Sequence, residues 1–143
     1  NPISGEFFFS EKGKGSFLND VNISVSKADD LRKSLVVTGF PYDSSSFKPD
    51  PFIIFKKFLM LDVPIRRLGS AALDLCWTAC GRFEGFWEYN LNAWDVAAGY
   101  LILTEAGGKV SDFKGGKYSV YGKQILATNG LIHDQMLEVI SEK

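Results

Sequence analysis

The chain has 143 residues, of which 45% are hydrophobic and 23% are charged, and its formal net charge is −1. This composition is typical of a globular domain with an ordinary hydrophobic core. The near-zero charge gives no electrostatic basis for binding nucleic acid or an anionic membrane, and no apolar run is long enough to span a bilayer. We therefore expect no nucleic acid and no membrane among its partners.

The two cysteines and the single histidine form no metal-binding pattern. Cys76 and Cys80 lie four residues apart on a predicted helix, which suits two reduced core thiols better than a disulfide. His133 is far from both in the sequence and lies in a polar stretch, so no zinc site is expected. Reduced thiols are typical of the cytosol, and we therefore predict a cytoplasmic protein.

The beginning of the chain predicts a small antiparallel sheet. Residues 6–10 and 15–18 are short strand candidates joined by a turn, and together they predict a hairpin. Alternation over residues 21–26 predicts a third strand, and the charged stretch 27–33 is the best candidate for a domain boundary. The chain opens without a methionine, and three consecutive phenylalanines in its first strand have few visible partners. We therefore expect the chain to begin inside a longer protein.

From residue 35 onward, predicted strands and helices alternate. Alternating or β-branched runs predict strands at 35–38, 65–68, 83–88, 109–112 and 125–128. Helical periodicity and capping residues predict helices at 51–63, 70–79, 94–106 and 130–142. This order is typical of a layered α/β sandwich whose helices cover both faces of a sheet. We predict a hairpin unit over residues 1–33 and a three-layer α/β domain over residues 34–143.

The first predicted helix has a well-marked start, because Asp50 can cap it and Pro51 suits its first position. Phe52, Phe55 and Leu59 share one face of this helix, and its two lysines lie on another. Such a pattern predicts that the aromatic face packs inward.

One carboxylate, Asp95, has an unusual setting. An apolar segment of helix length follows it at once, and two glycines at 107–108 supply the stop, so Asp95 lies in the first turn of a helix that we expect to be buried. A buried acid is costly unless a cation meets it. Asp95 can either cap its helix or bind a metal ion. Asn92 offers an alternative cap, which would leave Asp95 free for another task.

Three further features could belong to a binding site. Small residues at 69–72 open a helix and would let a ligand approach its free N–H groups, although close packing also requires small residues. Glu88 ends an aromatic strand and could accept hydrogen bonds from a polyol, or be a solvated strand end. Arg66 and Arg67 could neutralise a phosphate, or be a surface pair. On residue type alone, the structural explanation is the commoner one for each.

Two strings carry a resemblance to a known family. They are GSAALDLCWTACGRFEGFWE at residues 69–88 and WDVAAGYLILTEAGG at residues 94–108. Both resemble the inositol monophosphatase family, the magnesium-dependent, lithium-sensitive sugar phosphatases. The opening NPISGEFFFSEKGKGSFLND is similar to the hairpin region of that family, and the closing ILATNG to its last strand. The resemblance implies the C-terminal half of the sugar-phosphatase fold, with a leading hairpin that belongs to the N-terminal half.

By position, the resemblance implies roles for five residues. Asp95 would be a ligand of Mg²⁺, and Glu88 would accept a hydroxyl of the inositol ring. The same ring would be lined by Gly69, Ser70 and Ala71. The resemblance also implies a homodimer when the enzyme is intact, and it places a serine-containing loop at the rim of the site, at residues 42–44.

This chain departs from the family pattern at one important place. The family's first signature, Asp-Pro-Ile-Asp-Gly-Thr, and the upstream glutamate that shares its metals are absent. We therefore expect no catalytic residue in this chain and a separate or missing N-terminal half as its partner. The implied reaction is hydrolysis of inositol-1-phosphate or a related sugar phosphate, such as fructose 1,6-bisphosphate or histidinol phosphate. The alternative is a regulatory or scaffold module that keeps the half-fold without enzyme activity.

Overall fold

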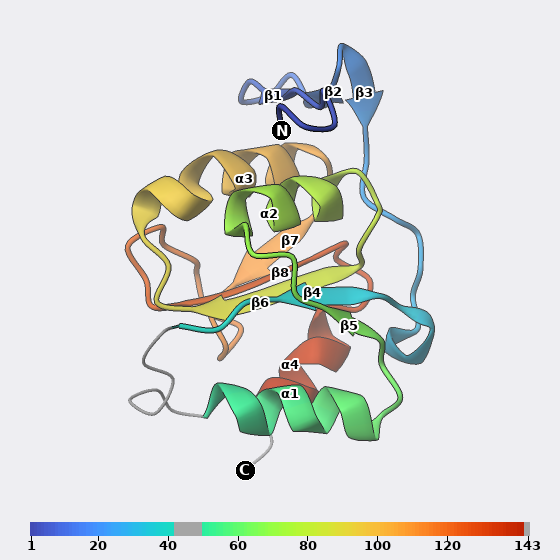
Figure 1. Cartoon of the computed structure of the whole chain (residues 1–143), viewed down its shortest axis with the longest axis vertical. Coiled ribbons are helices and arrows are strands. Elements are labelled where there is room, and N and C mark those ends of the chain that lie inside the picture. Colours follow the sequence, from blue (N-terminus) through green and yellow to red (C-terminus); the bar gives the residue numbers. More distant parts are fainter. Residues whose placement is uncertain (42–49, 142–143) are drawn as a thin grey trace.

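The computed structural model describes residues 1–41 and 50–141 as a stack of four layers (Figure 1). A small antiparallel sheet lies on one pair of helices, which covers one face of a five-stranded sheet, and a second pair of helices covers the other face. The predicted layered α/β fold, with helices on both faces of the central sheet, is confirmed.

The small sheet rests on the C-terminal part of the third helix. Its antiparallel strands are, in order, β1 (Phe8–Ser10), β2 (Ser16–Leu18) and β3 (Val21–Ile23). The Ser16 hydroxyl donates to the carbonyl of Ile102 at 2.6 Å, and the Glu105 carboxylate accepts the N–H of Gly13 at 2.9 Å. The first of these hydrogen bonds is buried and the second is exposed, and together they hold the sheet on the helix. The domain boundary at residue 33 stays a prediction.

The central sheet has the strand order β5-β4-β6-β8-β7. β4 runs parallel to β5 and β6, whereas β8 is antiparallel to β6 and β7. The strands are β4 (Val36–Thr38), β5 (Ile65–Arg66), β6 (Gly85–Tyr89), β7 (Lys109–Ser111) and β8 (Gln124–Thr128). All five predicted strands of this region are therefore present, with small shifts at their ends.

Each face of the central sheet has its own helices and its own core. α1 (Pro51–Met60) and α4 (His133–Ser141) cover one face, and α2 (Ala71–Ala79) and α3 (Ala93–Glu105) cover the other (Figure 1). α2 and α3 approach closely at Gly99, where an added Cβ would lie 2.6 Å from the Cβ of Leu75. None of the helices in the described ranges could cross a bilayer.

Two expectations about helix faces are wrong. In α1, Ile54 and Phe58 are fully buried, whereas Phe52 and Leu59 are 55% and 50% exposed. Eight of the ten α1 residues are apolar, so two faces are available and the sequence pattern cannot choose between them. In α3, only one side is buried, and Trp94 near its start is 80% exposed.

Candidate functional site

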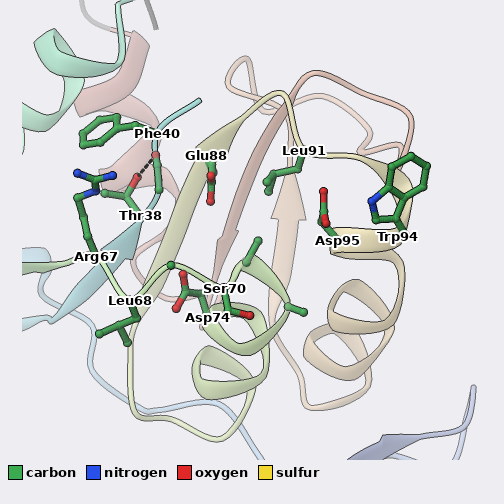
Figure 2. A pocket seen from close by; sticks show the side chains of 14 residues that line it. Thr38, Phe40, Arg67, Leu68, Ser70, Asp74, Glu88, Leu91, Trp94 and Asp95 are labelled. Carbon is green, nitrogen blue, oxygen red and sulfur yellow. Dashed lines mark hydrogen bonds between the residues drawn. The ribbon is translucent and has the colours of Figure 1, made fainter. Parts of the chain in front are cut away.

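A cavity of about 690 Å³ opens where the C-terminal ends of β4 and β6 meet the beginnings of α2 and α3 (Figure 2). Its described lining residues are Thr38, Gly39, Phe40, Arg67, Leu68, Gly69, Ser70, Ala71, Ala72, Asp74, Glu88, Leu91, Trp94 and Asp95. All five residues that the sequence singled out for the site are among them. The loop at 42–44, expected at the rim, lies outside the described residues.

Glu88 projects from β6 into this cavity and is packed against the backbone of Gly39. A Cβ added at Gly39 would overlap the Glu88 carboxylate, so the glycine leaves room for the side chain in this position. Burial, and after it the carboxylates of Asp74 and Asp95, raise the pKa of Glu88 to about 7, against a smaller opposite effect of Arg67. Glu88 is therefore a partly buried acceptor and not the solvated strand end that was its alternative.

Asp74 is a cavity residue that the sequence reasoning missed. It lies in the first turn of α2, is 1% exposed, and its Oδ1 atom has no hydrogen-bond partner among the described residues. Burial raises its pKa to about 7. The signal that could have identified it is simple: Asp74 is the one charged residue in a helix that is otherwise apolar almost all round.

The start of α2 forms the base of the cavity. Ser70 is the predicted cap, and its hydroxyl accepts the N–H of Leu73 at 3.4 Å. Gly69 has φ +88°, a conformation that a side chain would strain. The N–H groups of Ala71 and Ala72 belong to the first helical turn, which has no carbonyl partners within the helix. They are available to an oxygen of a ligand.

Asp95 takes part in the cap of α3 and also faces the cavity. Its Oδ2 atom accepts the backbone N–H of Asn92 at 2.9 Å and the Asn92 side-chain amide at 3.2 Å. Asn92 is the N-cap residue, as expected, but it does not release the carboxylate, because its side chain donates to Asp95. Within the described part of the chain, Oδ1 of Asp95 makes no hydrogen bond, so one oxygen remains for a ligand.

The two arginines separate. Arg66 donates to the carbonyl of Ile65 at 3.0 Å, whereas the guanidinium of Arg67 lies 4.5 Å from the centre of the Phe40 ring at the edge of the cavity. Among the described lining residues, Arg67 is the only cation beside the three carboxylates. The cavity is therefore rich in hydrogen-bond acceptors.

The sequence matches the inositol monophosphatase family over residues 1–143. The chain belongs to this family. Its similarity extends to proteins with different names: the inositol-1-monophosphatase of Caulobacter vibrioides is 41% identical over 143 residues, which cover 96% of this chain and 55% of that protein. The putative Nus factor SuhB of Neisseria meningitidis is 43% identical over 140 residues, which cover 98% of this chain and 54% of that protein.

A solved structure agrees with the fold. The inositol monophosphatase from Anabaena (Nostoc) matches with a TM-score of 0.92 and 42% identity, covering 97% of this chain and 55% of that one. The chain thus spans about half the length of these relatives. The predicted family, and the prediction that the chain corresponds to about half of a family member, are confirmed.

The cavity offers oxygen ligands for a metal ion, but its described residues do not form a complete metal site. The described residues contain no group of three or more His, Cys, Asp or Glu side chains that could hold a metal ion. Mg²⁺ prefers oxygen ligands and keeps several waters, so the open oxygen of Asp95 fits the role of one ligand among several.

Proposed function

We propose that this chain forms the alcohol-binding wall, and supplies one metal ligand, of a magnesium-dependent phosphomonoesterase that acts on inositol-1-phosphate or a related sugar phosphate. The observation that supports the proposal most is the shared cavity. Glu88 as a partly buried acceptor, Asp95 with one oxygen open, and the start of α2 all face one space. Family membership supports hydrolysis of a phosphate ester.

In this proposal the two carboxylates have separate tasks. Glu88, held against Gly39, accepts a hydroxyl of the leaving alcohol and so orients the ring. Gly69, Ser70 and Ala71 support the same ring from the start of α2, where free N–H groups can donate to its oxygens. Neither group needs to touch the phosphorus atom, so this chain would position the substrate and not attack it.

Asp95 would hold a magnesium ion through the oxygen that Asn92 does not use. Bound magnesium would neutralise the phosphate and lower the pKa of a water molecule. The helix start that surrounds Asp95 fixes its side chain before any ion arrives, because both hydrogen bonds come from Asn92.

Further properties of the intact enzyme belong to the same proposal. They are a cytoplasmic location, sensitivity to lithium, a homodimer, and a catalytic N-terminal half that carries the family's first signature. Fructose 1,6-bisphosphate, whose alcohol portion presents several hydroxyls, and histidinol phosphate, whose alcohol portion presents N–H donors, are alternative substrates.

A second candidate function has its own support. Relatives at 38% to 43% identity are named Nus factor SuhB, so a regulatory or scaffold role without turnover is the alternative for this chain. The alternative requires no magnesium and no ring-binding carboxylate. It is therefore separable from the enzyme by substitutions in the cavity.

The test compares two substrates in an intact enzyme, that is, a polypeptide in which a family N-terminal half precedes residue 1. Inositol-1-phosphate carries ring hydroxyls, and 4-nitrophenyl phosphate carries none. Asp95→Asn should abolish turnover of both, because it removes the charge that a metal requires. Glu88→Gln should lower kcat/KM for inositol-1-phosphate by the equivalent of roughly 1.5–3 kcal/mol. It should leave kcat/KM for the aryl phosphate unchanged. Glu138→Gln, on the exposed side of α4, is the matched control.

Each outcome separates the candidates. Equal losses on both substrates with Glu88→Gln would remove the ring-binding role of Glu88. Near-normal turnover of Asp95→Asn at saturating magnesium would reduce Asp95 to a helix cap. No phosphate release by the intact wild-type protein would favour the regulatory role. The 143-residue chain alone should not turn over either substrate, since one ligand cannot build a magnesium site.

A further inference from the structure

Asp74 is buried at a position where the fold does not satisfy it. Its side chain is 1% exposed, and in the part of the chain that the structure describes Oδ1 has no hydrogen-bond partner. A buried polar group without a partner is costly, and a carboxylate more so. The start of α2 offsets part of this cost through its dipole, yet no donor reaches the carboxyl group within the described residues. The unliganded fold is therefore less stable for having an aspartate here.

Asp74 and Glu88 enter the same cavity from two different walls, α2 and β6 (Figure 2). The Glu88 carboxylate lies against Gly39, in the space that a Cβ at that position would occupy. The nearby charges are the carboxylate of Asp95 on α3 and the guanidinium of Arg67, which lies over Phe40. Two hydrogen-bond acceptors thus face one space with few donors around them.

The ligand that satisfies both acceptors must donate hydrogen bonds without adding negative charge. A phosphate is repelled by carboxylates, and the described residues provide no set of three ligands for a metal ion. Hydroxyl groups donate and carry no charge.

On the basis of the function proposed above, we propose that Asp74 is a second hydroxyl-binding residue of this cavity, and that the site selects a polyol ring that presents one hydroxyl to Glu88 and another to Asp74. Asp74 is then a specificity-determining residue for the alcohol portion of the substrate. A ring with one hydroxyl leaves one carboxylate unsatisfied and should bind more weakly.

The binding experiment uses the intact enzyme defined above and free myo-inositol, followed through backbone amide shifts in ¹H–¹⁵N NMR spectra at pH 8. Cyclohexanol is the one-hydroxyl control ligand. Wild type should show saturable shifts at residues around the cavity with myo-inositol and much smaller ones with cyclohexanol. Asp74→Asn should weaken myo-inositol binding about tenfold, as expected for loss of a charge-assisted hydrogen bond. Asp134→Asn is the matched control, since Asp134 lies in the first turn of α4 and is exposed.

A stability measurement distinguishes a binding role from a structural one. If Asp74 serves a ligand, Asp74→Asn and Asp74→Ala should not lower the melting temperature of the unliganded intact enzyme, and Asp74→Asn should raise it. A marked drop in melting temperature for both variants would overturn the proposal, because it would give Asp74 a structural role.

The binding outcomes separate this inference from the proposed function. Unchanged myo-inositol binding in Asp74→Asn would overturn the role of Asp74 and leave the role of Glu88 standing. Equal binding of cyclohexanol and myo-inositol would overturn the two-hydroxyl requirement. No saturable shift with myo-inositol in wild type would overturn the alcohol-binding wall itself, and with it the proposed function.

Discussion

His133 and Asp74 are buried titratable residues in the first turns of helices on opposite faces of the central sheet, and they differ in how the fold treats them (Figure 1). His133, at the start of α4, has a partner for each ring nitrogen: Ser111 Oγ lies 2.9 Å from Nε2, and Thr128 Oγ1 lies 2.9 Å from Nδ1. Asp74, in α2, has no partner for Oδ1 within residues 1–41 and 50–141. One group is completed by the protein, and the other leaves a hydrogen-bonding position open.

The comparison shows how a structural polar group can be told from a functional one. Burial favours the neutral form of both groups, so it lowers the pKa of His133 to about 4 and raises the pKa of Asp74 to about 7. A shifted pKa therefore does not separate them. The partners do: a satisfied buried group stabilises the fold, whereas an unsatisfied one lowers stability unless a ligand completes it.

The largest expected effect concerns the satisfied group. His133→Ala removes a fully buried ring, leaves a cavity, and deprives two hydroxyls of a partner. The free energy of unfolding, measured by urea denaturation, should fall by about 3 kcal/mol. Glu138→Ala on the exposed side of the same helix should change it by no more than about 0.5 kcal/mol. A loss below about 1 kcal/mol in His133→Ala would mean that the cluster contributes little to the core.

The next effect is the dependence of stability on pH, which has opposite signs for the two groups. The pKa of His133 is lowered in the fold, mainly by burial and then by Lys109, so its contribution is full above pH 6.5 and is lost as pH falls toward about 4. The pKa of Asp74 is raised, so its contribution is full near pH 4 and is lost as pH rises toward about 7. Glu88 acts in the same direction as Asp74.

Removing either residue should therefore change how stability depends on pH, in opposite directions for Asp74→Asn and His133→Ala. Between pH 7 and pH 4.5, Asp74→Asn should gain less stability than wild type, because one of the two acids that oppose the histidine is removed and only Glu88 remains. His133→Ala should gain more stability than wild type over the same range, so wild type should lie between the two variants. Urea unfolding in half-unit steps of pH gives the three slopes. Parallel curves would show that these two residues do not control the acid response.

A smaller effect tests the open hydrogen-bonding position directly. Asp74→Asn should raise the free energy of unfolding at pH 8 by about 1–2 kcal/mol, because it removes a buried charge and keeps the shape. The gain should shrink at pH 5, where the carboxyl group is already protonated in the fold. Asp134→Asn breaks only the exposed ion pair with Lys109 and should cost at most about 0.5 kcal/mol. A loss of stability in Asp74→Asn at pH 8 would contradict the comparison.

The same two residues show what the sequence could and could not predict. Strands and helices followed from periodicity, and the cap at Ser70 from residue type, because these depend on neighbours in the chain. His133 was placed in a polar stretch, yet it is fully buried, because its partners Ser111 and Thr128 come from two adjacent strands, β7 and β8. The contacts of His133 with Ser111 and Thr128 leave no pattern in the local sequence.

The site was predicted in part for a similar reason. Family strings identified Glu88 and Asp95, which are carried by motifs. Asp74 belongs to one of those strings but has no motif role, and its importance depends on the absence of a donor in three dimensions. Gly39 precedes the motifs, and only the fold shows that Glu88 occupies the space where its Cβ would be. A residue that leaves room for another side chain, or that lacks a hydrogen-bond donor, can be recognised only from the three-dimensional structure.

The smallest expected effect is spectroscopic and concerns the position of one proton. The Ser111 hydroxyl donates to the carbonyl of Asp112 at 2.7 Å, so toward His133 it can only accept, which requires a proton on Nε2. The Thr128 hydroxyl accepts the N–H of Gly130 at 3.1 Å and is free to donate to Nδ1. Both contacts therefore select the neutral tautomer with hydrogen on Nε2. Long-range ¹H–¹⁵N correlation spectra should show this single tautomer from pH 5.5 to pH 8, unchanged by Asp74→Asn. A proton on Nδ1, or a mixture of tautomers, would mean that the fold does not fully complete His133, and the contrast with Asp74 would then be one of degree.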